Sequence, residues 1–181
     1  MSLGETLRRA IRPSTTRSTA ALWAKSLLNA VLFFAIFMAA LPWLAGRALP
    51  QALPVPAPLR SGPAAAIALA GFAIWLACLD TFSRRGRGTP LPADAPSQLV
   101  TTGVFAWTRN PIMLGELGIV WAEALHFASL GVALYAFALS AVAHRLVVHV
   151  EEPELRERFG QPYLDYCRAV PRWLPRLGRP G

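Results

Sequence analysis

Two uncharged runs, each about as long as a bilayer is thick, constrain this fold more than any other feature. The first is Leu27 to Ala45, "LLNAVLFFAIFMAALPWLA", which has 19 residues and no charged side chain. The second, Ser61 to Leu79, has the same length and also lacks charge. A helix of that length is roughly 30 Å long, which matches the hydrocarbon core of a membrane. Backbone in lipid must satisfy its own hydrogen bonds, so we expect each run to be a spanning helix.

Composition supports a membrane protein. Apolar residues make up 54% of the 181-residue chain and charged residues only 15%, well below the roughly 25% of soluble domains. The net charge of +8 comes almost entirely from arginine. With such long apolar runs, this charge indicates cytoplasmic loops and anionic headgroups rather than nucleic acid. The two cysteines and three histidines lack ligand spacing, so we expect no disulfide framework and no metal site.

A third apolar stretch runs 40 residues from Pro111 to Val150, with Glu116, Glu123 and Arg145 as its firm charges. As one straight helix it would be roughly 60 Å long, about twice the bilayer core, so it must fold back near residues 126–131. We therefore predict an all-α, polytopic membrane helical bundle of one domain, 1–181, with spans three and four as a tight hairpin and a cytoplasmic helical tail. The predicted spans are about 24–45, 62–81, 111–127 and 130–150.

Arginine and lysine counts predict the orientation. Five precede the first span, two lie in the first loop, four in the loop from Arg84 to Arg109, none at the hairpin tip and seven from Arg145 onward. Positive charge accumulates on the cytoplasmic side, so both termini are expected there. Two polar clusters, at the two open ends of the hairpin, would then lie on the same side and could meet.

The first cluster is "VFAWTRNPIMLG", residues 104–115. Gly103 permits a turn before it. Asn110 and Pro111 suit a helix start, with asparagine as the cap and proline in the first turn. This local chemistry is explained equally by a capped helix at a membrane surface and by a binding loop.

The second cluster, "EEPELRERFGQPYLDYCRAVPRWLP", begins at Glu151. Two acids at the end of a helix oppose its dipole, and Pro153 should kink any helix that continues. The acid pair suggests a cationic or hydroxyl-rich partner. The alternative is a solvated helix end on which Arg156 and Arg158 neutralise the acids at helical spacing.

Together the clusters resemble the isoprenylcysteine carboxyl methyltransferase and phospholipid methyltransferase superfamily of integral membrane enzymes. The resemblance covers residues 88–175. The matching positions of the first motif are Leu99, Val100, Gly103, Phe105, Arg109, Asn110, Pro111, Met113 and Gly115. Those of the second are Glu151, Glu152, Leu155, Phe159, Gly160, Tyr163, Tyr166, Val170, Pro171, Arg172 and Pro175.

This resemblance implies an S-adenosylmethionine-dependent enzyme that methylates a lipid or lipid-linked acceptor arriving sideways from the bilayer. The cofactor would bind on the cytoplasmic side, between a loop over 88–115 and a tail over 151–176 that packs over it. The cofactor contacts it implies are Leu99, Val100, Phe105, Asn110, Pro111, Ile112, Met113 and Glu151. Glu116 is a candidate base on the acceptor side, and packing polarity within the hairpin is the alternative explanation for it. Arg109 and Arg145 are candidates to orient the acceptor, and anchoring at the membrane interface is the alternative explanation for both.

The match departs from the family pattern in places that bear on the acceptor. Asn110 replaces a common histidine, and Phe105 and Met113 replace frequent tyrosines. The prenylcysteine enzymes carry an arginine just before the acid pair, where this chain has Val147 and Val148. A prenylcysteine carboxylate is therefore no better supported than another lipid, an amine or a thiol. Two other functions stay open: a membrane reductase with a nicotinamide cofactor, and a non-catalytic membrane protein of the same fold.

Overall fold

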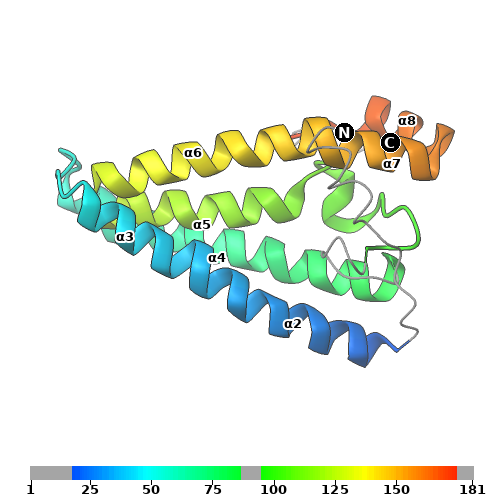
Figure 1. Cartoon of the computed structure of the whole chain (residues 1–181), viewed down its shortest axis with the longest axis horizontal. Helices are drawn as coiled ribbons and strands as arrows, with labels where there is room; N and C mark the ends of the chain where they lie inside the picture. The colour runs from blue at the N-terminus through cyan, green and yellow to red at the C-terminus, as the bar shows by residue number, and fades with distance from the viewer. Residues whose placement is uncertain (1–17, 87–94, 175–181) are drawn as a thin grey trace. The chain divides into compact units, whose positions relative to one another are not determined.

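The computed structural model describes residues 18–86 and 95–174 (Figure 1). The basic amino-terminal segment, the start of the predicted cofactor loop (88–94) and the end of the predicted tail (175–176) lie outside the described residues. Contacts divide the described chain into two compact units. The first unit holds residues 18–28, 76–86, 95–111 and 144–174, and the second holds 29–75 and 112–143.

The described chain is helical, as predicted (Figure 1). Between residues 18 and 86 lie α2 (Thr19–Ala35), η1 (Ile36–Ala40), α3 (Leu41–Ala48), α4 (Ala57–Thr81) and η2 (Phe82–Gly86). Between residues 95 and 174 lie η4 (Gly103–Ala106), α5 (Pro111–Phe127), α6 (Leu130–Leu146), η5 (Val147–Glu151), α7 (Glu152–Phe159) and α8 (Gln161–Ala169). An isolated antiparallel bridge pairs Ala52 with Ser129.

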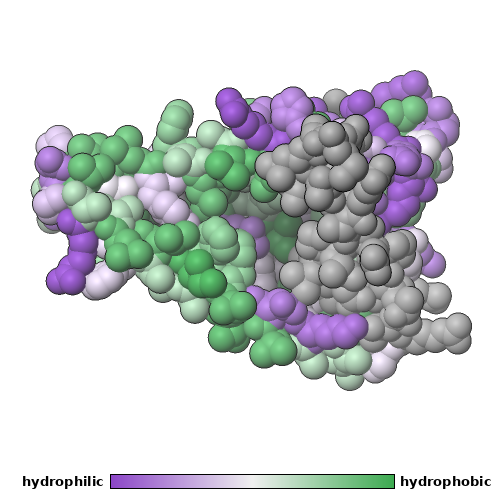
Figure 2. Space-filling model, in the orientation of Figure 1, coloured by the Kyte–Doolittle hydropathy of each residue, from purple (hydrophilic) through white to green (hydrophobic). Residues whose placement is uncertain are grey.

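Within the described residues, three continuous helical stretches are long and apolar enough to cross a membrane: Ala20–Ala48, Ala57–Gly86 and Leu130–Phe159. In Figure 2 hydrophobic residues cover much of the surface along α2 and α3, whereas the surface over α7 and α8 is largely hydrophilic. The third predicted span, 111–127, corresponds to α5, which has 17 residues and carries Glu116 and Glu123. A four-span arrangement stays a prediction.

Two of these helical stretches continue past a proline, and in both a π-helix precedes the proline. Pro42 and Pro153 each lie at the beginning of an α-helix, directly after a five-residue π-helix, η1 or η5. In the turn before Pro153, the N–H of Glu152 donates to the carbonyl of Val147, five residues back. A proline ring clashes with the carbonyl four residues before it and offers no N–H. The wider π turn takes up that conflict, so the kink expected at Pro153 takes the form of a π segment.

Helix α4 begins earlier than the predicted span 62–81. It starts at Ala57, so Pro58 falls in the first turn, where its missing N–H costs little. Pro63 lies inside the helix and is exposed, and its neighbours carry no charge.

Small residues let the helices of the second unit approach at the backbone. A Cβ atom added to Gly71 on α4 would come within 2.5 Å of the carbonyl oxygen of Gly115 on α5, and one added to Gly115 within 2.6 Å of that of Gly71. Such close crossings between small residues are typical of helix packing in membranes. Around this unit's core, Met38, Val120 and Ala136 are buried together.

The loop before α4 and the turn after α5 are joined within the second unit. The N–H of Leu53 donates to the carbonyl of Ala128 at 2.6 Å, and the N–H of Leu130 donates to that of Gln51 at 3.0 Å. Helix α5 ends at Phe127 and α6 begins at Leu130, within the region where the sequence predicts a turn. Ala128 has a positive φ of 45°, which allows so short a connection.

Candidate functional site

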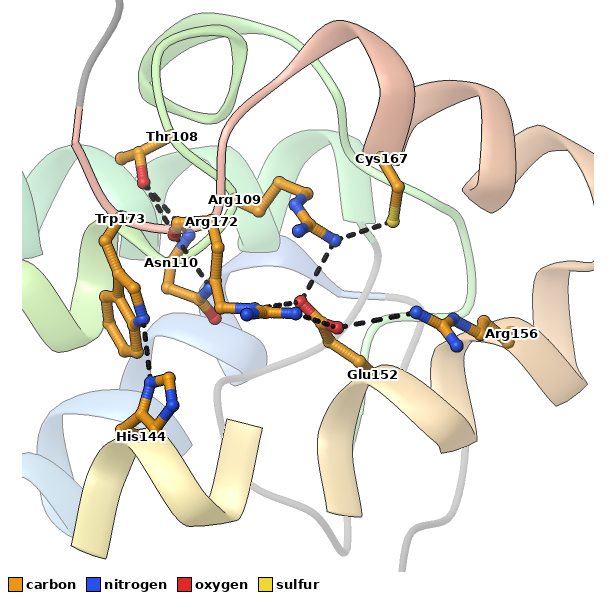
Figure 3. Close-up of polar contacts among 9 residues, drawn as sticks. All are labelled: Thr108, Arg109, Asn110, His144, Glu152, Arg156, Cys167, Arg172 and Trp173. Atoms are coloured by element: carbon orange, nitrogen blue, oxygen red, sulfur yellow. Dashed lines mark hydrogen bonds and ion pairs between the residues drawn. The ribbon is translucent and has the colours of Figure 1, made fainter. Parts of the chain in front are cut away.

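The two polar clusters of the sequence meet inside the first unit (Figure 3). The side chains of Thr108 and Asn110 each donate a hydrogen bond, 3.0 Å long, to the carbonyl oxygen of Arg172. The backbone N–H of Arg109 donates to the carbonyl of Pro171 at 2.9 Å. These partners are about 60 residues apart in the chain. The segment before α5 and the segment after α8 are therefore held together by hydrogen bonds.

A single buried carboxylate, that of Glu152, receives arginines from both clusters. Arg172 binds it in bidentate fashion, with Nε 2.7 Å from Oε1 and Nη2 2.9 Å from Oε2. Arg109 Nη1 lies 3.0 Å from Oε1, and Arg156, one turn further along α7, lies 3.7 Å from Oε2. Figure 3 shows Glu152 between these three guanidinium groups. We call these four residues the Glu152 cluster.

Two members of the Glu152 cluster, Glu152 and Arg109, are held away from water. The Glu152 residue is 3% exposed, and the Arg109 side chain is 10% exposed. The hydrogen bond to Glu152 raises the pKa of Arg172 above its ordinary value, with the charge of Glu152 adding to the effect. Burying an unpaired charge is costly, so the buried charges of Glu152 and Arg109 depend on each other, whereas Arg156 is 54% exposed.

Arg109 has a second partner. Its Nη1 also donates to Sγ of Cys167 on α8 at 2.6 Å, and its Nε is buried without a hydrogen-bond partner among the described residues. The guanidinium is therefore anchored to α7 and α8 and retains one buried donor.

Apolar packing joins α8 to the same loop. Tyr163, Tyr166 and Val170, spaced three and four residues apart, form one buried face of α8 and the segment after it. Leu99 packs against this face from the loop. The hydroxyl of Tyr166 donates to the carbonyl of Phe105 at 2.7 Å.

Neither tyrosine of this face is suited to act as a base. Burial raises the pKa of both Tyr163 and Tyr166 well above the ordinary value. Their hydroxyls stay protonated near neutral pH, which suits the donor role of Tyr166. The packing explanation of these residues is therefore sufficient by itself.

Most of the predicted cofactor residues are found in the first unit. Val100 is buried against Gly86, and Phe105 is buried with its ring 5.0 Å from that of Phe82. Asn110 and Pro111 are buried at the start of α5. The remaining two of that unit, Leu99 and Glu151, are half-buried.

Ile112 and Met113 belong to the second unit, where both are half-buried on the first turn of α5. Glu116, the predicted base, is also half-buried there, one residue after the close crossing at Gly115. Of the two arginines expected to orient an acceptor, Arg109 is part of the Glu152 cluster and Arg145 is exposed on α6.

Glu151 and Glu152 have different surroundings although they are neighbours in sequence. Glu151 is the last residue of the π segment η5 and is half-buried, whereas Glu152 begins α7 and receives the arginines. A π turn alters the direction of successive side chains relative to a regular helix, and such turns are frequent at functional sites. The local helix geometry thus separates the two acids.

Sequence reasoning missed the residues that hold the two clusters together, namely Thr108, Glu152, Cys167 and Arg172. Glu152 and Arg172 belong to the second motif, so the acid pair and the "VPR" segment were visible signals. Their pairing needs a turn at Gly160, which has φ 59° and ψ −133°. The sequence does not show how close this turn brings the two side chains.

A further pair links the tail to α6. The indole N–H of Trp173 donates to Nδ1 of His144 at 3.1 Å, and the two rings lie 6.0 Å apart. The segment 171–173 is thus held by α6, α7 and the loop before α5. In residues 18–86 and 95–174 no group of three or more His, Cys, Asp or Glu side chains is placed to hold a metal ion.

Comparison with known proteins supports the resemblance of the two motifs. A model of the phospholipid methyltransferase family matches residues 63–162, which is 100 of 181 residues. The chain is 36% identical over 92 residues to methanethiol S-methyltransferase 2 of Bradyrhizobium diazoefficiens, covering 50% of this chain and 33% of that protein.

It is also 36% identical over 73 residues to a methanethiol S-methyltransferase of Mycobacterium tuberculosis, covering 40% of this chain and 28% of that protein. The chain thus spans about a third of the length of these curated relatives. No solved structure matches. Because the family match covers more than half of the sequence, the chain belongs to the phospholipid methyltransferase family.

Proposed function

We propose that this protein is a membrane methyltransferase that transfers a methyl group from S-adenosylmethionine to a lipid or lipid-linked acceptor at the cytoplasmic face. The observation that carries the proposal is the union of the two motifs. Thr108, Arg109 and Asn110 of the first are bonded to Pro171 and Arg172 of the second.

The chemistry of the residues in the first unit fits this cofactor. Glu151 would lie beside one of the cofactor's cationic groups, because a half-buried carboxylate attracts positive charge more strongly than an exposed one. Leu99 and Phe105 supply apolar surface, and Asn110 supplies a side-chain amide. The buried Nε of Arg109 is a donor available to a carboxylate. From the second unit we propose Ile112 and Met113 as further contacts.

The bound cofactor would supply an activated methyl group, and the rest of the chemistry is positioning. Methyl transfer from sulfur is an in-line displacement, so rate depends on alignment and on exclusion of water. We assign these tasks to the packed face of Tyr163 and Tyr166 and to the Glu152 cluster. An amine or thiol acceptor must also lose a proton, for which we propose Glu116. Arg145 is exposed and so could orient an acidic headgroup.

A small thiol is the second candidate acceptor. It is favoured by one observation, that both curated relatives are methanethiol S-methyltransferases. The similarity covers half of this chain at most. A thiol acceptor would use the same cofactor site and the same proton acceptor.

Isothermal titration of detergent-purified protein with S-adenosylhomocysteine tests the cofactor site. We expect micromolar binding by the wild type, weakened at least tenfold in Glu151→Ala, since about 1.4 kcal/mol is lost with a charged partner. Glu157→Ala is the matched control, because Glu157 is an exposed acid on the adjacent helix α7. Absence of binding by folded wild-type protein, with binding of a nicotinamide cofactor instead, would favour the reductase alternative.

The acceptor is then identified with methyl-labelled S-adenosylmethionine. Total lipid extract and methanethiol are supplied separately to the same preparation, and label is followed into the lipid phase and into the volatile thioether. Label in lipid supports the first candidate, and label in the volatile fraction alone supports the second. Glu116→Gln should lower turnover of a thiol or amine acceptor but leave the cofactor affinity unchanged.

A further inference from the structure

We propose that Glu152 is a positioning residue for the cofactor site, which it completes by fixing the segment 170–173 against the turn 108–111. This inference rests on the proposed function for its consequence, cofactor affinity, but its structural part is testable alone. Glu152 was not among the residues expected to bind the cofactor. Its role follows from its contacts.

One carboxylate joins three segments of the first unit. Oε1 of Glu152 binds Arg109 from the loop and Nε of Arg172 from the tail. Oε2 binds Nη2 of Arg172 and lies 3.7 Å from Arg156 of α7 itself. A bidentate arginine pair fixes the angle between its partners as well as their distance. Glu152 therefore sets the orientation of the tail relative to the loop.

Arg172 is held at both of its ends. Its guanidinium binds Glu152, while its backbone carbonyl accepts hydrogen bonds from Thr108 and Asn110. Asn110 is one of the proposed cofactor residues. Loss of the Glu152 carboxylate would free the guanidinium, loosen the carbonyl that Asn110 binds and so disturb the cofactor contact. It would also leave Arg109 buried with its charge unpaired.

A double-mutant cycle tests this coupling. The variants are Glu152→Gln, Arg172→Gln and the double substitution. The controls are Glu157→Gln, an exposed acid on α7, and Arg168→Gln, whose side chain on α8 is 74% exposed. Two quantities are measured on full-length protein in detergent: amide hydrogen exchange of peptides covering 105–111 and 166–173, and the Kd for S-adenosylhomocysteine.

We expect each single substitution to speed exchange in both peptides by about tenfold and to raise the Kd by about tenfold. The double variant should resemble one single variant, because the effects of substitutions at two contacting residues are not additive. The control variants should match the wild type in both measurements. Thermal unfolding identifies the temperature at which every variant is folded, and both measurements are made below it. A uniform loss of stability would speed exchange throughout the chain and not in these two peptides alone.

Unchanged exchange in Glu152→Gln would overturn the proposal, and so would additive effects of the two substitutions. Faster exchange together with an unchanged Kd would also overturn it, because the tail would then be positioned without effect on the cofactor. If the wild type itself binds no S-adenosylhomocysteine, the proposed function fails, and the exchange data alone decide whether Glu152 fixes the tail.

Discussion

Single hydrogen bonds within the first unit hold the two motifs together. In one of them, the hydroxyl of Tyr166 on α8 donates to the carbonyl of Phe105, which lies 61 residues earlier in the chain. Both groups are buried, so no water replaces the lost partner when one is removed. The same argument applies to Asn110 and the carbonyl of Arg172.

Tyr166→Phe should lower the free energy of unfolding by about 1–2 kcal/mol, because the Phe105 carbonyl loses its donor in a buried place. The thermal unfolding temperature of the purified protein measures the loss, and hydrogen exchange locates it at residues 103–107. Tyr135→Phe is the comparison, since its hydroxyl donates to the carbonyl of Phe37 in the second unit. If Tyr135→Phe speeds exchange at 103–107 as much as Tyr166→Phe does, the assigned contact is wrong.

At the scale of elements, the crossing of α4 and α5 depends on two glycines with no room for a side chain. Gly71→Ala or Gly115→Ala should destabilise the protein by about 1–3 kcal/mol, because each added methyl meets a backbone oxygen that cannot rotate away. Thermal unfolding in detergent measures the effect. Gly62→Ala on α4 is the control, since nothing lies within 4 Å of its Cβ position. Alanine there should leave stability equal or slightly higher, and equal losses at 62 and 71 would contradict the crossing.

The turn between α7 and α8 makes a different demand on glycine. Gly160 has φ 59° and ψ −133°, a combination that residues with a Cβ rarely adopt, although open space surrounds it. Gly160→Ala should therefore cost about 1–3 kcal/mol through backbone strain alone. Exchange in 161–170 should speed up and S-adenosylhomocysteine should bind more weakly. Unaltered exchange in α8 would show that the turn tolerates a side chain.

At the scale of the whole molecule, the arginine distribution predicts which side of the membrane each loop faces. Gln51 lies in the loop before α4 and Gln98 in the loop before η4, and both side chains are exposed. In intact cells a membrane-impermeant maleimide should label Gln51→Cys, whereas Gln98→Cys should react only after permeabilisation. The native Cys78 is buried and Cys167 half-buried, so the unsubstituted protein provides the background. The reverse labelling pattern would invert the predicted orientation.

The sequence by itself determined the helical class, the first two long apolar helices and the start of α5 at Pro111, because these depend on local composition, on helix length and on residues with fixed backbone preferences. Gly103 likewise adopts the positive φ, 67°, that its position suggests. The two motifs indicated the family for a related reason: their residues and spacing are readable along the chain.

Only the tertiary structure decided how the second motif is used. Glu151 and Glu152 are the same residue type in adjacent positions, so the sequence does not distinguish them. The π turn before Pro153 and the positive φ of Gly160 bring Glu152, and not Glu151, to Arg109 and Arg172. Such pairings join residues that are distant in sequence, and they depend on the angles accumulated over every intervening turn. No local preference contains those angles, so the Glu152 cluster became visible only once the chain was folded.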